Sequence, residues 1–257
     1  YRAMNLSRRL LLKLTALSFW RGGKEQPSLA AADPGPPFGE EFPNLDSLAT
    51  GDWWTKSAKG ATAPPSMNVA RKDVIAFALY TQHRGVLKMT AQLFPLKPGE
   101  SRRVRLELFR DGAWKEAQQP DVVTPGWSAH FRVENWDATR DVKYRVRHGD
   151  DAMFEGTIRR DPIDKEEIVV ANMSCNSSRT TGQRAEIVDG LLAADPDLLF
   201  FGGDQTYRHT EHTAGWIEFG LQFRDVIRDR PTVTIPDDHD VGPPNLWGEN
   251  GKRSTLR

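Results

Sequence analysis

The sequence has one cysteine, no excess of charge of either sign and no long apolar run, and each shortage excludes a class of protein. Its single cysteine, Cys175, allows no internal disulfide in the 257-residue chain, which excludes a disulfide-rich scaffold. Lysine and arginine together number 35, as do aspartate and glutamate, so net charge gives no argument for a nucleic acid or an anionic membrane as the partner. The apolar region Leu10–Trp20 is too short to span a membrane, which needs about 20 residues. Hydrophobic residues make up 38% and charged residues 27%, which is typical of a soluble globular protein.

The residues near the N-terminus resemble a bacterial export signal. Ser7–Lys13 reads Ser-Arg-Arg-Leu-Leu-Leu-Lys, which is similar to the twin-arginine motif, and Ala30–Ala32 offers a small-residue cleavage site. A basic amphipathic helix is the alternative interpretation. We predict residues 1–32 to be a twin-arginine-type signal peptide, recognised by the twin-arginine export machinery, and the protein to be periplasmic or extracellular.

Residues 33–70 are predicted to be a Pro/Gly-rich linker. Proline and glycine punctuate them at Asp33–Pro37 and again at Ala63–Pro65, and no helical or strand period is sustained between. Trp53 and Trp54 lie within this segment, so we expect part of it to dock on a folded domain.

Residues 71–163 predict an antiparallel β-sandwich of the Fn3/Ig-like class. Arg103–Arg110 alternates polar and apolar residues strictly, and Asp111–Gly112 follows as a hairpin turn. Further short runs bounded by turns bring the total to about six or seven strands. Most of the eight tryptophans precede residue 140, which predicts either a separate core or a binding face in this half of the chain.

Residues 164–257 alternate apolar runs with helical stretches, as in an α/β domain. The runs are Ile168–Ala171, Leu198–Phe201 and Thr232–Ile235, and the helical stretches between them are Gln183–Ala194 and Ala214–Asp229. Right-handed crossovers would make the three strands parallel. Leu198–Phe201 has no polar break and is followed by Gly-Gly, which predicts a strand buried on both faces.

Polar residues follow each of these strands. Cys175 comes after the first, Asp204 and Tyr207 after the second, and Asp237–Asp240 (Asp-Asp-His-Asp) after the third. Ligands bind at this edge of open α/β sheets, and crowded carboxylates repel one another unless a cation neutralises them. An oxygen-rich set with one thiolate and one phenolate predicts a hard metal, with ferric iron at one position.

Each of these features also has a simpler interpretation. An aspartate after Gly-Gly is often a turn residue or a helix N-cap. Asp237–Asp240 taken alone describes a solvated acidic loop, and a lone cysteine after a strand is usually a small core residue. The placement of all three at successive strand ends favours the metal site.

Over roughly residues 70–250, these motifs resemble the alkaline phosphatase D (PhoD-like) branch of the metallophosphoesterases. The resemblance implies a β-sandwich followed by an αββα catalytic domain, of which the chain holds an incomplete part in residues 164–257. It implies that Cys175, Asp204 and Tyr207 ligate Fe³⁺ and that Asp204 bridges to a second metal. Asp238 stands where the general pattern has a metal-ligating asparagine, and its added negative charge favours Ca²⁺ over zinc there.

The resemblance also implies catalytic roles. His239 would donate a proton to the leaving-group oxygen or stabilise its developing charge, and Asp240 would hold the His239 ring by accepting its other N–H. Asn245 would reach the phosphate.

The predicted function is metal-dependent hydrolysis of phosphoric esters, as a phosphomonoesterase or a phosphodiesterase. Further strands and later histidine and aspartate ligands of the family are missing, so we expect the chain to be the front portion of the enzyme and inactive alone. The alternative is a secreted non-catalytic protein whose Trp-rich β-sandwich binds a polymer beside an inert α/β remnant.

Overall fold

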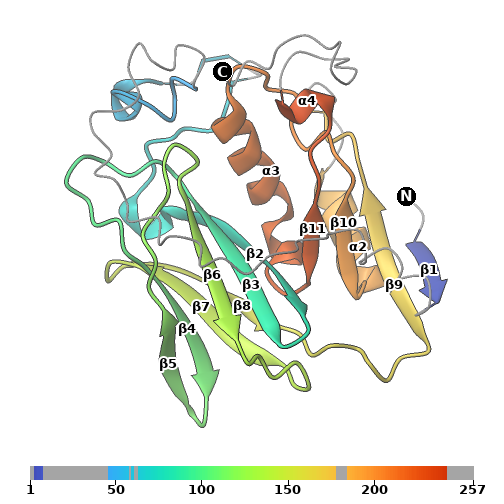
Figure 1. Cartoon of the computed structure of the whole chain (residues 1–257). Helices are drawn as coiled ribbons and strands as arrows, with labels where there is room; N and C mark the ends of the chain where they lie inside the picture. Colours follow the sequence, from blue (N-terminus) through green and yellow to red (C-terminus); the bar gives the residue numbers. More distant parts are fainter. Residues whose placement is uncertain (1–2, 8–45, 58, 61–62, 178–183, 242–257) are drawn as a thin grey trace, which may run out of the picture.

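The computed structural model describes residues 3–7, 46–57, 59–60, 63–177 and 184–241. Two regions lie side by side in it (Figure 1). The strands β2 to β8 form one region, and a mixed sheet with its helices forms the other. The two predicted halves are therefore packed against each other.

The first region contains two antiparallel sheets. One sheet has the order β2-β3-β6, and the other has the order β5-β4-β7-β8. The strands are β2 (Ile75–His83), β3 (Val86–Leu93), β4 (Val104–Arg110), β5 (Ala113–Gln118), β6 (Ser128–Glu134), β7 (Val142–His148) and β8 (Ala152–Ile158). The antiparallel strands that alternation predicted are thus present.

The turn and the core of this region follow from the residues that occupy them. Asp111 and Gly112 both have positive φ, 53° and 76°, as the tight turn between β4 and β5 requires. On β7, Val142, Tyr144 and Val146 are buried and alternate with more exposed side chains.

The segment that precedes β2 docks on this core. Trp53 lies in the short 3₁₀ helix η2 (Trp53–Thr55) and is only 2% exposed. The indole N–H of Trp127 donates to the carbonyl of Ala49 (3.0 Å). Buried Asp46 accepts the backbone N–H of Ala214 at 3.2 Å, so it caps a helix of the other region. A second 3₁₀ helix, η3 (Arg71–Asp73), leads into β2.

The second region has the predicted β-α-β-α-β order. Its sheet runs β1-β9-β10-β11; β9, β10 and β11 are parallel, and β1 pairs antiparallel with β9. The elements are β1 (Ala3–Ser7), β9 (Glu167–Met173), α2 (Arg184–Ala194), β10 (Leu198–Phe201), α3 (His212–Ile227), β11 (Thr232–Thr234) and α4 (Asp238–Val241). The prediction of three parallel strands is confirmed.

The prediction that Leu198–Phe201 is buried on both faces was wrong. Leu199 and Phe201 are buried in a core shared with α2 and α3, whereas Leu198 and Phe200 are only half-buried. The connections from β9 to β10 and from β10 to β11 run in the same direction across the sheet. Because crossovers of the same handedness place their helices on the same side, α2 and α3 both cover one face of the sheet. On α2, Val188 and Leu191 are buried in this core, whereas Leu192 is 40% exposed.

The strand β1 lies within the segment predicted to be a signal peptide. The two arginines of the predicted signal, Arg8 and Arg9, lie outside the described residues. The predicted linker lies outside them as well, up to residue 45. In the part of the chain that the structure describes, no helix is long and apolar enough to cross a membrane. The export signal therefore stays a prediction.

The two regions contact each other through α3 and β2 and through the chain that follows α3. Tyr144 donates its hydroxyl hydrogen to the carbonyl of Arg228 (2.9 Å), and the backbone N–H of Thr157 donates to Asp229 (2.7 Å). In α3, Gly220 faces the ring of Phe77, where an added Cβ would lie 1.9 Å from a ring carbon. The absence of a side chain at Gly220 thus permits the close approach.

We expect Gly220→Ala to destabilise the protein by about 1–3 kcal/mol, because the new methyl group overpacks a ring that is itself buried. Urea unfolding followed by tryptophan fluorescence measures this change. The matched control is Gly190→Ala in α2, where nothing lies within 4 Å of the added Cβ. There the higher helix propensity of alanine should stabilise by up to about 1 kcal/mol. Equal effects of the two substitutions would contradict the packing account.

Candidate metal centre

The loops that follow β9, β10 and β11 meet at the carboxyl edge of the sheet. Oxygen and nitrogen donor atoms of Asp204, Asp238 and His239 all lie within 4.8 Å of one another. Cys175 Sγ lies 3.7 Å from a carboxylate oxygen of Asp204, and the Tyr207 hydroxyl donates to the same oxygen (2.9 Å). The structure therefore brings these five predicted residues together. Asn245 lies outside the described residues.

The first two loops are held in conformations that side chains rarely adopt. Cys175 and Asp204 have φ values of 58° and 57°, in the left-handed region, and Gly203 has a φ of 99°. The backbone N–H of Cys175 donates to the carbonyl of Gly203 (3.2 Å), and that of Asn176 donates to the carbonyl of Asp204 (2.8 Å). Two adjacent backbone bonds thus join the loops and bring Cys175 and Asp204 close together.

The third loop approaches the second at Gly203. A Cβ on Gly203 would lie 2.5 Å from the Cβ of Asp237, so only glycine allows this separation. Asp204 is only 6% exposed, while Asp238 and His239 are half-buried.

Asp240 is hydrogen-bonded to the backbone of these loops and not to the ring of His239. Its carboxylate accepts backbone N–H groups of Asp204 (2.6 Å), Thr206 (3.0 Å) and Asp237 (3.0 Å). The predicted hydrogen bond from the His239 ring to Asp240 is thus wrong. The turn into α4 directs the Asp240 carboxylate toward these backbone N–H groups instead. Burial raises the pKa of Asp240, the nearby Asp204 charge adds to the rise, and the three amides oppose it.

The ring of His239 contacts two residues of the second loop. Its Nδ1 is hydrogen-bonded to Nε2 of His209 (2.7 Å), and its centroid lies 4.1 Å from that of the Tyr207 ring. Its backbone N–H donates to Asp204 at 3.3 Å. His209 was not predicted from the sequence. The sequence places His209 two residues after Tyr207, which could have drawn attention to it. A lone histidine in a loop, however, does not indicate which residue it contacts.

The donor set suits a cation. Among the ion pairs within the described residues, none involves Asp204 or Asp240. Burial and the hydrogen bonds to Cys175 and Asp204 raise the pKa of Tyr207, so the phenol is protonated and donates to the carboxylate. A cation at this point would neutralise the carboxylates, and it would favour ionised phenol and thiol ligands.

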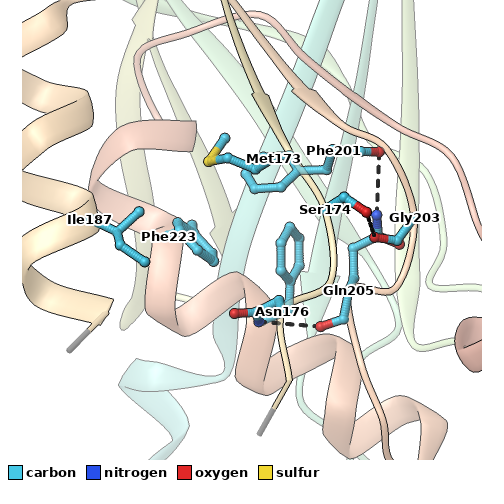
Figure 2. Close-up of a pocket in the computed structure, with 9 residues that line it drawn as sticks. Met173, Ser174, Asn176, Ile187, Phe201, Gly203, Gln205 and Phe223 are labelled. Atoms are coloured by element: carbon cyan, nitrogen blue, oxygen red, sulfur yellow. Dashed lines mark hydrogen bonds between the residues drawn. The ribbon is translucent and has the colours of Figure 1, made fainter. Parts of the chain in front are cut away.

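A pocket beside the site is lined mainly by apolar side chains (Figure 2). Its walls include Met173, Phe201 and Phe223, with Ser174 and Asn176 from the loop after β9. The amide of Asn176 donates to the carbonyl of Gln205 (3.2 Å), so it ties the pocket to the second loop. The proposed ligands do not line this pocket, which lies between the loops and the helices that support them.

Comparisons with known proteins find solved structures that are similar to this chain. No family model matches the chain, and no curated protein matches it in sequence. Among solved structures, that of PhoD is similar with a TM-score of 0.56 and 13% identity, over 71% of this chain and 43% of PhoD. A purple acid phosphatase, PPD1 from yellow lupin (Lupinus luteus) seeds, is similar with a TM-score of 0.44 and 12% identity, over 69% of this chain and 37% of PPD1. The chain thus spans less than half the length of either protein, and the likeness to PhoD shows that the chain has a fold similar to that of PhoD.

Proposed function

We propose that the chain is the front portion of a metal-dependent phosphoric-ester hydrolase of the alkaline phosphatase D type, with a β-sandwich of the Fn3/Ig-like class before an αββα catalytic domain. The observation that carries the proposal is the meeting of Asp204, Asp238 and His239 donor atoms within 4.8 Å, at the ligand-binding edge of a fold like that of PhoD. The substrate is a phosphate monoester or diester.

Cys175, Asp204 and Tyr207 would hold Fe³⁺, and Asp204 together with Asp238 would hold Ca²⁺ or another divalent ion. The contacts among Cys175, Asp204 and Tyr207 support one shared position for these three ligands. Bound metals supply Lewis acidity toward the phosphoryl oxygens and a hydroxide nucleophile at moderate pH.

The remaining residues would orient the substrate and move a proton. His239 would donate a proton to the leaving oxygen as the phosphorus–oxygen bond breaks. Asp240 would keep the loops of Asp204 and Asp238 together through its backbone bonds. Asn245 would bind the phosphate.

The test compares this chain with a clone of the complete protein. Metal content and turnover of a chromogenic phosphomonoester and a phosphodiester are measured for both. We expect bound metal and turnover in the complete protein and no turnover by the chain alone. A complete protein with neither metal nor turnover would favour the alternative, a non-catalytic protein that binds through its sandwich. The burial of Trp53, Trp127 and Trp136 in the core counts against that alternative, because buried rings cannot form a binding face.

Tyr207→Phe tests the iron assignment through colour. Phenolate or thiolate bound to Fe³⁺ gives a visible charge-transfer band, so we expect the iron-loaded complete protein to be coloured. Loss of the phenol should bleach or shift the band, as measured by visible absorption at equal iron content. A colourless iron-loaded wild type, or a band unchanged in Tyr207→Phe, would contradict the assignment.

We also propose export by the twin-arginine route to the periplasm or the medium, on the pattern of Ser7–Lys13. Replacing Arg8 and Arg9 together by lysine keeps the charge but not the motif. The precursor of this double variant is expected to stay in the cytoplasm, as shown by fractionation and immunoblotting. Undiminished export would mean that the arginines supply only positive charge.

A further inference from the structure

A buried glutamine joins the ends of two strands beside the metal centre. Gln205 is only 5% exposed, and it directly follows Asp204 in the loop after β10. Its side-chain nitrogen, Nε2, donates to the carbonyl of Phe201 (3.3 Å; Figure 2) and to the carbonyl of Ile235 (3.2 Å). One amide group thus contacts the last residue of β10 and the residue that follows β11.

These two carbonyls lie at equivalent places in the chain. Phe201 precedes Asp204 by three residues, and Ile235 precedes Asp238 by three residues. The backbone N–H of Ile235 also donates to the carbonyl of Phe201 (3.1 Å), so the two strand ends are adjacent. The separation of the strand ends therefore determines where each loop starts on its way to the centre.

The three loops of the centre are joined in two different ways. Backbone N–H groups of Cys175 and Asn176 donate to backbone carbonyls of the second loop, so the first two loops are joined through their backbones. Side chains join the second loop to the third. Asp240 accepts backbone N–H groups of both loops, and Gln205 donates to carbonyls at the ends of both strands. The distance between these two loops thus depends on side chains, which a substitution can remove.

An amide is chemically suited to this place. Buried carbonyl oxygens require hydrogen-bond donors, and the side chains of lysine, arginine and glutamine can each supply two. A lysine or arginine would add a positive charge next to Asp204, and this charge would repel a cation bound there. The neutral amide of Gln205 supplies both bonds without adding a charge. Gln205 therefore joins the strand ends and leaves the carboxylates of the centre to a metal.

Gln205 is itself held by the first loop and by α3. The side-chain amide of Asn176 donates to the backbone carbonyl of Gln205 (3.2 Å) and to Oε1 of Gln222 (2.9 Å). Because Gln222 belongs to α3, these bonds connect Gln205 to a helix of the supporting layer. A residue that positions others needs such a rigid support.

We propose that Gln205 is a positioning residue for the second metal: its amide fixes the separation of the strand ends that precede Asp204 and Asp238, and so the distance between the two carboxylates that would hold a divalent ion. The bonds of Gln205 are seen in the geometry, while their consequence for metal binding rests on the proposed function. Because the proposed Fe³⁺ ligands all belong to the first two loops, Gln205 affects the divalent ion and not the iron.

The joining of the strand ends is tested in this chain, without metal, by amide hydrogen exchange resolved by NMR. Gln205→Met keeps an unbranched side chain of similar length and removes its N–H donors. We expect the backbone N–H of Ile235, which donates to Phe201, to exchange about 3–10-fold faster in this variant, the factor that corresponds to one lost hydrogen bond. Unchanged exchange at Ile235 would overturn the proposal.

Gln92→Met is the matched control. Gln92 of β3 is also buried, and its Nε2 also donates to backbone carbonyls, those of Leu93 (2.9 Å), Gly126 (2.9 Å) and Trp127 (3.2 Å). It belongs to the sandwich, so the same substitution there should lower stability and leave exchange at Ile235 unchanged.

The consequence for metal binding is tested in the complete protein loaded with iron. Equilibrium dialysis against Mn²⁺, a hard divalent ion, measures the affinity of the second position. We expect Gln205→Met to weaken Mn²⁺ binding by about 10–100-fold, the usual scale for a residue that orients metal ligands, with iron content and the visible band unchanged. Gln92→Met should change neither metal. Unchanged Mn²⁺ affinity in Gln205→Met, or an equal loss of iron and Mn²⁺, would overturn the positioning role.

The two experiments separate this proposal from the proposed function. A complete wild-type protein that binds neither metal contradicts the proposed function and with it the metal-positioning role, while the exchange result still decides whether Gln205 joins the strand ends. Circular dichroism identifies a variant that fails to fold. Gln205→Asn then takes the place of Gln205→Met: its amide is one methylene shorter and cannot reach both carbonyls, so the same selective loss of Mn²⁺ is expected.

Discussion

Asp204→Asn is expected to empty the metal centre and to lower turnover by the complete enzyme by on the order of 10³-fold or more, since about 4 kcal/mol of lost metal assistance corresponds to that factor. Asparagine is the informative substitution, because Asp204 has a φ of 57°, which asparagine adopts more readily than alanine. Tyr207 and the backbone N–H of His239 donate to different oxygens of the Asp204 carboxylate, so the single amide oxygen of asparagine can keep one of these two hydrogen bonds. The substitution therefore removes the charge and one hydrogen bond.

The measurement has a readout besides activity. Metal that binds only the folded protein raises its stability, by about 2.7 kcal/mol when the free metal is at 100 times its Kd. Added metal should thus raise the melting temperature of the wild type and leave that of Asp204→Asn unchanged. The matched control, Asp189→Asn on the exposed side of α2, should behave as the wild type. An Asp204→Asn protein that retains its full metal content would refute the bridging role.

His239→Ala is expected to keep both metals and to lose on the order of 10²–10⁴-fold in kcat, the usual scale for a general acid. Nδ1 of His239 is engaged by His209, so Nε2 is the nitrogen that remains for either role. Asp238→Ala should instead lose a metal together with nearly all activity. Metal analysis beside steady-state kinetics distinguishes the two variants.

The opposite pattern would reverse these roles. If His239→Ala loses a metal and Asp238→Ala does not, then His239 is the ligand, and the motif is aligned one residue away from its true position. Asp240→Asn belongs to the same series: one of its oxygens becomes an NH₂ group that cannot accept from the loop amides. Because three amides depend on that carboxylate, we expect a loss of stability as well as of activity.

The order of strands and helices and the meeting of Cys175, Asp204 and Asp238 could be predicted because both rest on rules that act locally or apply generally. Apolar periodicity predicts the elements, and the handedness of crossovers places successive strand ends on one edge. The likeness to PhoD agrees with that architecture.

The contacts of Asp240 and His209 could not be predicted, because each depends on where a loop passes. Asp240 accepts amides from residues up to 36 positions away, and the His209–His239 bond joins loops 30 positions apart. No periodicity encodes such contacts. The exposure of Leu198 and Phe200 was missed for another reason: an unbroken apolar run shows that a strand is apolar, but not which of its faces the helices cover.

The cap that Asp46 provides for α3 has a consequence for the order in which the protein is made. The two partners, Asp46 and the backbone N–H of Ala214, are separated by 168 residues. At a synthesis rate of 5–20 residues per second, Ala214 is added roughly 10–30 s after Asp46. The cap therefore forms only after the strands β2 to β10 have been synthesised. Trp53 and its neighbours can dock on the sandwich before then, but their link to the helix forms only after the start of α3 has been synthesised.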